Sequence, residues 1–118
     1  MRVHHVALRT HDLPRLERFY VDLLGFEVKA RLGQRSVWLD AGDAIVMLEK
    51  AAEHEPKIPE GSQEFLAFAI ATAQKIPFTD RLRAAGIAIE HSTEFTIYFR
   101  DPDGRRVGVS DFSVSDVL

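Results

Sequence analysis

The first quarter of the chain combines a β-type alternation with an amphipathic helical pattern. Residues 3–10 are a short β-type run, which predicts a strand with His5, Ala7 and Arg9 on one face and Val6 and Leu8 on the other. Asp12 is a good helix N-cap, and Gly25 can adopt the positive φ that ends a helix. Between them, apolar residues recur at helical spacing and predict one helix: Leu13, Leu16, Phe19, Tyr20, Leu23 and Leu24.

Three strand-like runs follow the helix, at residues 26–32, 36–40 and 44–49, with hairpin-type residues between them. Residues 51–63 are polar, contain two prolines and a glycine, and have no periodicity, which is typical of a surface linker.

The second half of the chain repeats this order of elements. Residues 64–71 predict a strand, and a helical pattern then ends at Ala85 and Gly86. Three further strands are predicted at residues 87–90, 95–100 and 106–111.

The repeat holds at residue level as well as in element order. Residues 5–9 align with residues 65–69, and residues 44–49 align with residues 105–110. Neither half can bury a one-sided sheet alone. The sequence therefore predicts an α+β fold in one domain, residues 1–118, built from βαβββ modules at residues 1–50 and 64–118.

Composition narrows the function. Of the 118 residues, 46% are hydrophobic and 28% are charged, which excludes a disordered or fibrous protein. With a net charge of −3, the chain has no basic excess to drive sequence-independent binding to nucleic acid. The absence of cysteine excludes disulfides, a thiolate nucleophile and zinc–thiolate sites. The sequence has no signal-peptide core and no apolar run of about 20 residues. We therefore expect a cytoplasmic protein without nucleic-acid or membrane partners.

Two motifs carry a resemblance to a known family. One is HVALRTHDL at residues 5–13, followed by Phe19-Tyr20 and by LLGF at residues 23–26. The other is IYFRDPDGRR at residues 97–106. With these motifs in this order, the chain resembles the vicinal oxygen chelate superfamily of glyoxalase I, bleomycin- and fosfomycin-resistance proteins and extradiol dioxygenases. The resemblance implies curled sheets paired around a cavity and, in many members, dimers.

The resemblance also implies where a metal would bind. In metal-dependent members, four side chains from the first and last strands of each module hold one divalent ion. The matching positions here are His5, Met47, Phe65 and Gly108. One imidazole cannot hold such an ion against water, so we expect neither a metal nor another cofactor.

A displaced metal site is the alternative. Glu49 shares the face of Met47 two residues further along and could join His5. His4 is expected to point to the opposite face and therefore cannot join them.

The residues in the metal positions also suggest a binding pocket. Met47 and Phe65, together with Trp38 and Tyr98, could line an apolar pocket, and Gly108 would leave room in it. Alternatively, these side chains fill the space and close the pocket.

The remaining candidates are polar. Arg9 could bind a ligand carboxylate or phosphate, or could reach into solvent, and His5 could add polarity. Arg100, Arg105 and Arg106 are expected to form a solvated, locally paired turn.

Three functions remain open. The leading hypothesis is metal-independent binding of a small organic ligand by a homodimer. The second is a metal-dependent lyase or dioxygenase that uses His5 and Glu49. The third is a non-catalytic dimerisation module.

Overall fold

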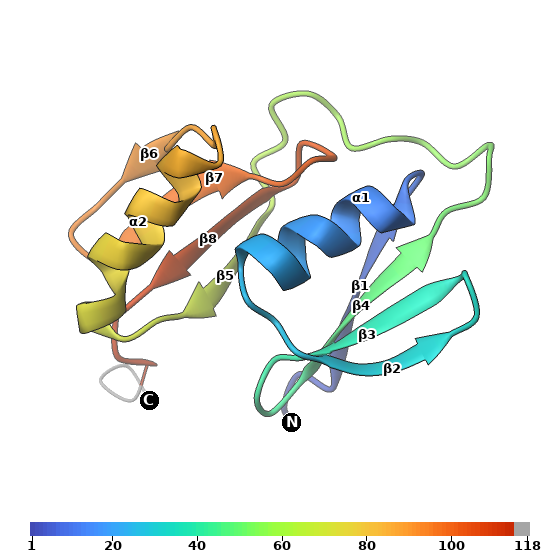
Figure 1. The fold of residues 1–118 in the computed structure, drawn as a ribbon, viewed down its shortest axis with the longest axis horizontal. Helices are drawn as coiled ribbons and strands as arrows, with labels where there is room; N and C mark the ends of the chain where they lie inside the picture. Colours follow the sequence, from blue (N-terminus) through green and yellow to red (C-terminus); the bar gives the residue numbers. More distant parts are fainter. Residues whose placement is uncertain (115–118) are drawn as a thin grey trace. The chain divides into compact units, whose positions relative to one another are not determined.

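The computed structural model describes residues 1–114 and divides the chain into two compact units, Met1–Lys57 and Ile58–Leu118. Each unit combines a four-stranded sheet with helices on one of its faces (Figure 1). Over residues 1–114, no helix has the length and hydropathy that a membrane span requires.

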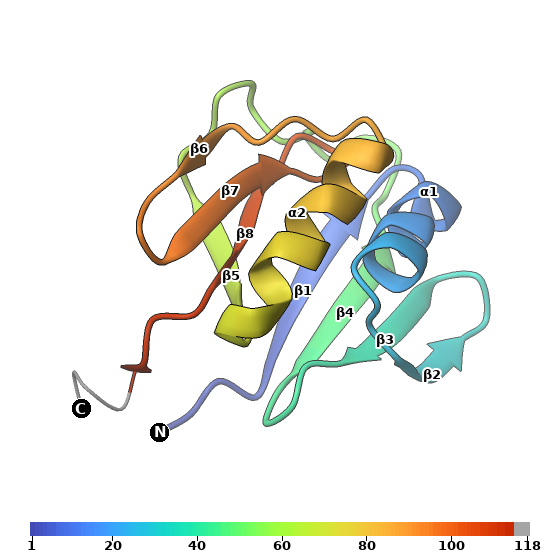
Figure 2. The ribbon, with the colours of Figure 1, turned by 60° about the vertical axis from the view of Figure 1, so that its left-hand side comes forward.

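The first unit contains one sheet and one continuous helical segment. Its strand order is β1-β4-β3-β2, with β1 parallel to β4 and the other pairs antiparallel. The helical segment lies over one face of this sheet (Figures 1 and 2). The elements are β1 (His5–Thr10), α1 (Leu13–Glu17), η1 (Arg18–Leu23), β2 (Val28–Leu32), β3 (Ser36–Asp40) and β4 (Ile45–Lys50).

Local chemistry sets the ends of this helical segment. The Asp12 carboxylate accepts a hydrogen bond from the Arg15 amide at 3.2 Å, which confirms the predicted N-cap. Gly25 follows the segment with a φ of +87°, as predicted. The sequence did not show that the second half, η1, widens into a π-helix.

The second unit repeats the arrangement of the first. Its strand order is β5-β8-β7-β6, again with one parallel pair, β5 with β8. In its core, the rings of Phe78 and Phe99 lie 5.8 Å apart, between the helix and the sheet. The elements are β5 (Phe65–Ala69), η2 (Thr72–Gln74), α2 (Lys75–Ala84), β6 (His91–Ser92), β7 (Thr96–Arg100) and β8 (Arg106–Ser110).

The observed order confirms the predicted fold class, which is α+β with two repeated βαβββ modules. Each module contains an open sheet, with two edge strands, rather than a closed barrel. The boundary between the two units falls within residues 51–63, the segment interpreted as a linker.

One predicted strand is wrong. Residues 87–90 form no strand, and β6 is the short segment His91–Ser92. The Ile87 amide donates to the Leu82 carbonyl at 2.9 Å, which ties the chain to the end of α2. Pairing with β7 begins only at Glu90, whose amide donates to the Tyr98 carbonyl. His91, which we placed after the strand, therefore lies within it.

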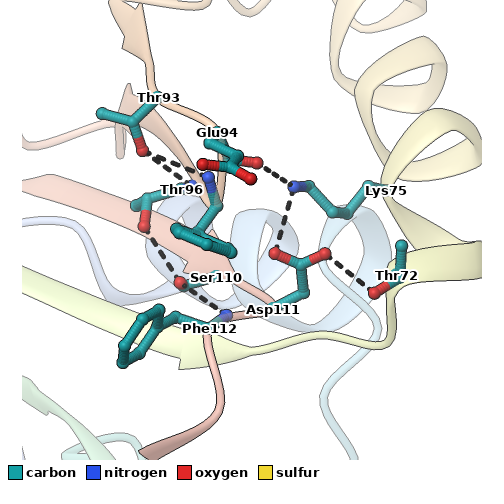
Figure 3. A network of polar contacts seen from close by, with 9 residues as sticks. Thr72, Lys75, Thr93, Glu94, Thr96, Ser110, Asp111 and Phe112 are labelled. Carbon is teal, nitrogen blue, oxygen red and sulfur yellow. Dashed lines mark hydrogen bonds and ion pairs between the residues drawn. The ribbon is translucent and has the colours of Figure 1, made fainter.

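A polar network fixes the start of α2 to the end of β8 (Figure 3). The Lys75 ammonium lies 3.2 Å from an Asp111 carboxylate oxygen and donates to the Glu94 carbonyl at 3.0 Å. The Thr72 hydroxyl donates to the other Asp111 oxygen at 2.8 Å and lowers the pKa of that carboxyl. These bonds join three segments of the second unit.

Burial beneath the helix predicts a matched pair of stability effects in the first unit. Leu16 on α1 is fully buried, whereas Leu32 on β2 is 50% exposed. Leu16→Ala should lower the free energy of unfolding by about 2–5 kcal/mol. Leu32→Ala should lower it by less than about 1 kcal/mol. Urea titration followed by the fluorescence of Trp38, the single tryptophan, measures both. Equal losses would contradict the assigned core.

Candidate functional site

The predicted site residues lie on the sheet faces that point away from the helices, which we call the helix-free faces. Strand registers place alternate residues there, while their neighbours Leu8, Leu48 and Val107 are buried toward the helices. The helix-free face of the first unit carries His5, Arg9, Trp38, Met47 and Glu49, and that of the second carries Phe65, Tyr98, Arg106 and Gly108.

The first helix-free face is apolar at its centre. Met47 on β4 lies in register with Ala7 on one side and Trp38 on the other. Trp38 is half-buried, and its indole N–H donates to the Ser36 hydroxyl at 2.9 Å. Met47 and Trp38 are thus register neighbours on this face.

Two carboxylates surround the Arg9 guanidinium at one end of this face. Glu49 lies 3.5 Å away, and Glu55 accepts a hydrogen bond from Arg9 Nε at 3.1 Å. The Ala52 amide also donates to Glu55, and the His11 ring hydrogen-bonds to the Glu55 carbonyl. Chiefly through the Arg9 hydrogen bond, the pKa of Glu55 falls to about 2. The Glu55 carboxylate therefore occupies the place beside Arg9 where we expected the carboxylate of a ligand.

Glu55 was not among the predicted site residues. The residue belongs to the aperiodic segment 51–63, where no spacing indicates a partner. One weak signal was available. Glu55 follows the strand at residues 45–50, and the neighbouring strand carries Arg9, for which the sequence shows no partner.

His5 has an unexpected neighbour at the other end of the face. The Nδ1 atoms of His4 and His5 lie 2.8 Å apart, and the ring centroids lie 5.1 Å apart. The expectation that these side chains point to opposite faces is wrong. Strand β1 begins at His5, so the alternation of a regular strand does not apply to His4.

The second helix-free face is built around a missing side chain. A Cβ on Gly108 would lie 2.2 Å from the Ile97 carbonyl oxygen and 2.8 Å from the Phe65 ring, so only glycine fits. Phe65 occupies this room and stacks on Tyr98, with ring centroids 4.5 Å apart. The space that we expected Gly108 to leave open therefore holds the Phe65 ring.

Arg106 continues the aromatic stack. Its guanidinium carbon lies 4.4 Å from the Tyr98 ring centroid and 5.7 Å from that of Phe65. The predicted local pairing within the turn holds only for Arg105, which lies 2.6 Å from Asp101, and this pair is largely buried rather than solvated. Arg106 belongs to the helix-free face instead, because β8 begins at this residue.

The residues at the four metal positions do not fit a divalent ion. They offer one imidazole, one thioether, a phenyl ring and a glycine, and only the imidazole is a good ligand for such an ion. Glu49, in the displaced alternative, lies beside the Arg9 guanidinium, which opposes a second cation. Within residues 1–114, no three histidine, aspartate or glutamate side chains gather in a metal-binding arrangement.

Repeated βαβββ modules with their site residues on the helix-free faces define a class of paired-module α+β proteins. The chain belongs to the Glyoxalase/Bleomycin resistance protein/Dioxygenase superfamily, whose family model matches residues 2–109.

Individual relatives agree with this assignment. The glutathione transferase FosA of Serratia marcescens is 31% identical over 110 residues, covering 89% of this chain and 77% of its own. The solved lactoylglutathione lyase of Agrobacterium tumefaciens is 25% identical, with a TM-score of 0.73 and 92% of each chain covered. The fosfomycin resistance protein FosX of Listeria monocytogenes shares the fold, with a TM-score of 0.80 at 18% identity over 99% of this chain and 96% of its own.

The Arg9–Glu55 contact predicts an unusually acidic carboxyl. Titration followed by carbon NMR should give Glu55 a pKa of about 2, and Arg9→Gln should return it to the ordinary range for glutamate. Because this pKa is lowered in the folded protein, the pair stabilises at neutral pH, and its contribution is lost as the pH falls toward 2. An unchanged titration in Arg9→Gln would contradict the contact.

The close approach at Gly108 predicts a steric penalty. Gly108→Ala should destabilise the second unit by about 1–3 kcal/mol, because the new methyl meets both a backbone carbonyl and the Phe65 ring. Combining it with Phe65→Ala removes only the ring contact, so part of the penalty should persist relative to Phe65→Ala alone. Thermal unfolding measures all three variants, and a neutral Gly108→Ala would contradict the geometry.

Proposed function

We propose that this protein binds a small, planar organic ligand on the helix-free face of its second module, without a divalent metal. The observation that carries the proposal is the Phe65 ring over Gly108, stacked on Tyr98. Two positions that hold metal ligands in metal-dependent relatives here form part of an aromatic surface. Phe65 is 37% exposed, so its ring remains accessible to a ligand.

Ring stacking suits a flat ligand. Aromatic pairs prefer offset-stacked arrangements and gain about 0.5–1.5 kcal/mol beyond the area they bury. The apolar pair Trp38 and Met47 supports a similar role for the first module, where His5 and Arg9 supply polarity. We also propose that the protein is a cytoplasmic homodimer, in keeping with the dimers common in the family.

A metal-dependent enzyme is the second candidate. One observation favours it: the His4 and His5 imidazoles lie together and could offer two nitrogen ligands instead of one. The FosA relative is named as a glutathione transferase. Group transfer is therefore a possible reaction for this second candidate, besides a lyase or dioxygenase reaction.

Titration of the isotope-labelled protein with the neutral probe 2-naphthamide tests the proposal. The probe should shift the amide signals of Gly108 and Ala67, and the shifts should be the same with EDTA as with added Zn²⁺ or Mn²⁺. Phe65→Leu should weaken binding at least about threefold, because it removes a stacking ring. Phe112→Leu is the matched control, since Phe112 is 43% exposed on another part of the second unit.

Two results would overturn the proposal. The first is the absence of any shift at Gly108 and Ala67. The second is binding that requires one metal ion per chain and is lost in His5→Ala, which would support the second candidate.

A further inference from the structure

We propose that the second helix-free face selects a planar ligand with a negative charge, such as an aromatic carboxylate, and that Arg106 recognises the anionic group. This inference rests on the proposed function and adds the charge of the ligand to it. Three features of the second unit support it: the balance of charges around Arg106, the hydrogen-bond donors of Arg106, and their position beside the aromatic stack.

The charge balance is positive. Arg100 on β7 and Arg106 on β8 face each other across the ladder, and both contact Glu90. The acids of the neighbouring turn do not add a second negative partner for Arg106. Asp101 pairs with Arg105, and Asp103 forms no ion pair within residues 1–114. Two guanidinium groups therefore share one carboxylate.

Arg100 donates hydrogen bonds to both oxygens of the Glu90 carboxylate. Its Nη2 donates to Glu90 Oε1 at 2.9 Å, its Nε donates to the other oxygen, and its Nη1 donates to the carbonyls of Ser62 and Gly104. These bonds engage all three nitrogens of Arg100. A ligand could bind to it only by displacing bonds within the protein.

Arg106 differs in this respect. Its Nε lies 3.3 Å from Glu90, outside hydrogen-bond geometry, and the part of the chain that the structure describes gives its guanidinium no hydrogen bond. The side chain is only 18% exposed, and the Tyr98 ring supports its plane at 4.4 Å. Because Nε is buried, a carboxylate would meet the two Nη groups of this guanidinium, whose N–H donors suit its two oxygens.

The position of Arg106 ties the charge to the ring surface. Phe65 and Arg106 are partners in the β5–β8 register, and Arg106 lies over both rings of the stack. A flat ligand on Phe65 would thus present a substituent to Arg106. The first module offers no such site, because Glu49 and Glu55 both contact Arg9.

The test compares 2-naphthoate with 2-naphthamide, which have similar shapes and differ in charge. Naphthoate should bind the wild-type protein about tenfold more tightly, and added NaCl should reduce that preference. Arg106→Gln should remove the preference, lowering the affinity for naphthoate by about tenfold more than the affinity for naphthamide. Glu90→Gln should strengthen naphthoate binding, because it removes the competing carboxylate. The control is Arg83→Gln. Arg83 is an exposed residue of α2, and removing its positive charge should change neither affinity.

Each result has a distinct meaning. Equal affinities for the two probes would overturn the charge inference and leave the proposed function intact, whereas no binding of either probe would overturn both. If a folded Arg106→Gln variant loses both probes equally, Arg106 merely supports the rings and the inference is wrong. If the Gly108 amide shifts with protein concentration and not with probe, this face binds a second copy of the chain, which also overturns it.

Discussion

Each module depends on the burial of one sheet face beneath one helical segment. Leu16 and Tyr20 supply the fully buried helical side chains in the first unit, and Leu82 does so in the second. Once that face is buried, the alternation of the strands places every second residue on the opposite face. Positions 5, 47, 65 and 108 are therefore held on helix-free faces whatever residues occupy them. The fold determines where ligand chemistry can occur but leaves its nature to the side chains.

Positions 65 and 108 hold a phenylalanine and a glycine instead of polar side chains. Ala67 and Gly108 are partners in the β5–β8 register, and Gly108 is also the partner of Tyr98 on β7. Two small residues leave room above the sheet, and Phe65 fills it from the edge strand. Because the Ile97 carbonyl lies so close, no other residue can replace Gly108 without strain. The aromatic surface thus depends on the missing side chain as much as on the rings.

Sequence patterns predicted what depends on local periodicity. The strand at residues 36–40 has the predicted bounds, Asp12 and Gly25 delimit the helix, and the faces of the site residues follow from alternation. The failures come from contacts that periodicity does not encode. The Leu82 carbonyl accepts a hydrogen bond from the Ile87 amide, and β6 begins only at His91 instead of spanning the predicted residues 87–90. Glu55 was missed, and Arg106 was assigned to the turn, because the contacts of both residues come from partners on other segments.

The two modules have diverged in charge while keeping one architecture. In the first, one guanidinium meets two carboxylates, and the lowered pKa of Glu55 keeps that carboxylate ionised at all ordinary pH values. In the second, two guanidinium groups meet one carboxylate, Glu90, whose pKa is also lowered, chiefly by the Arg100 hydrogen bond. Under the proposed function, an anion at the first site would have to displace Glu55 from Arg9, whereas at Arg106 it would compete only with the 3.3 Å contact to Glu90. The repeat thus supplies equivalent sheet faces that differ in the acids around their arginines.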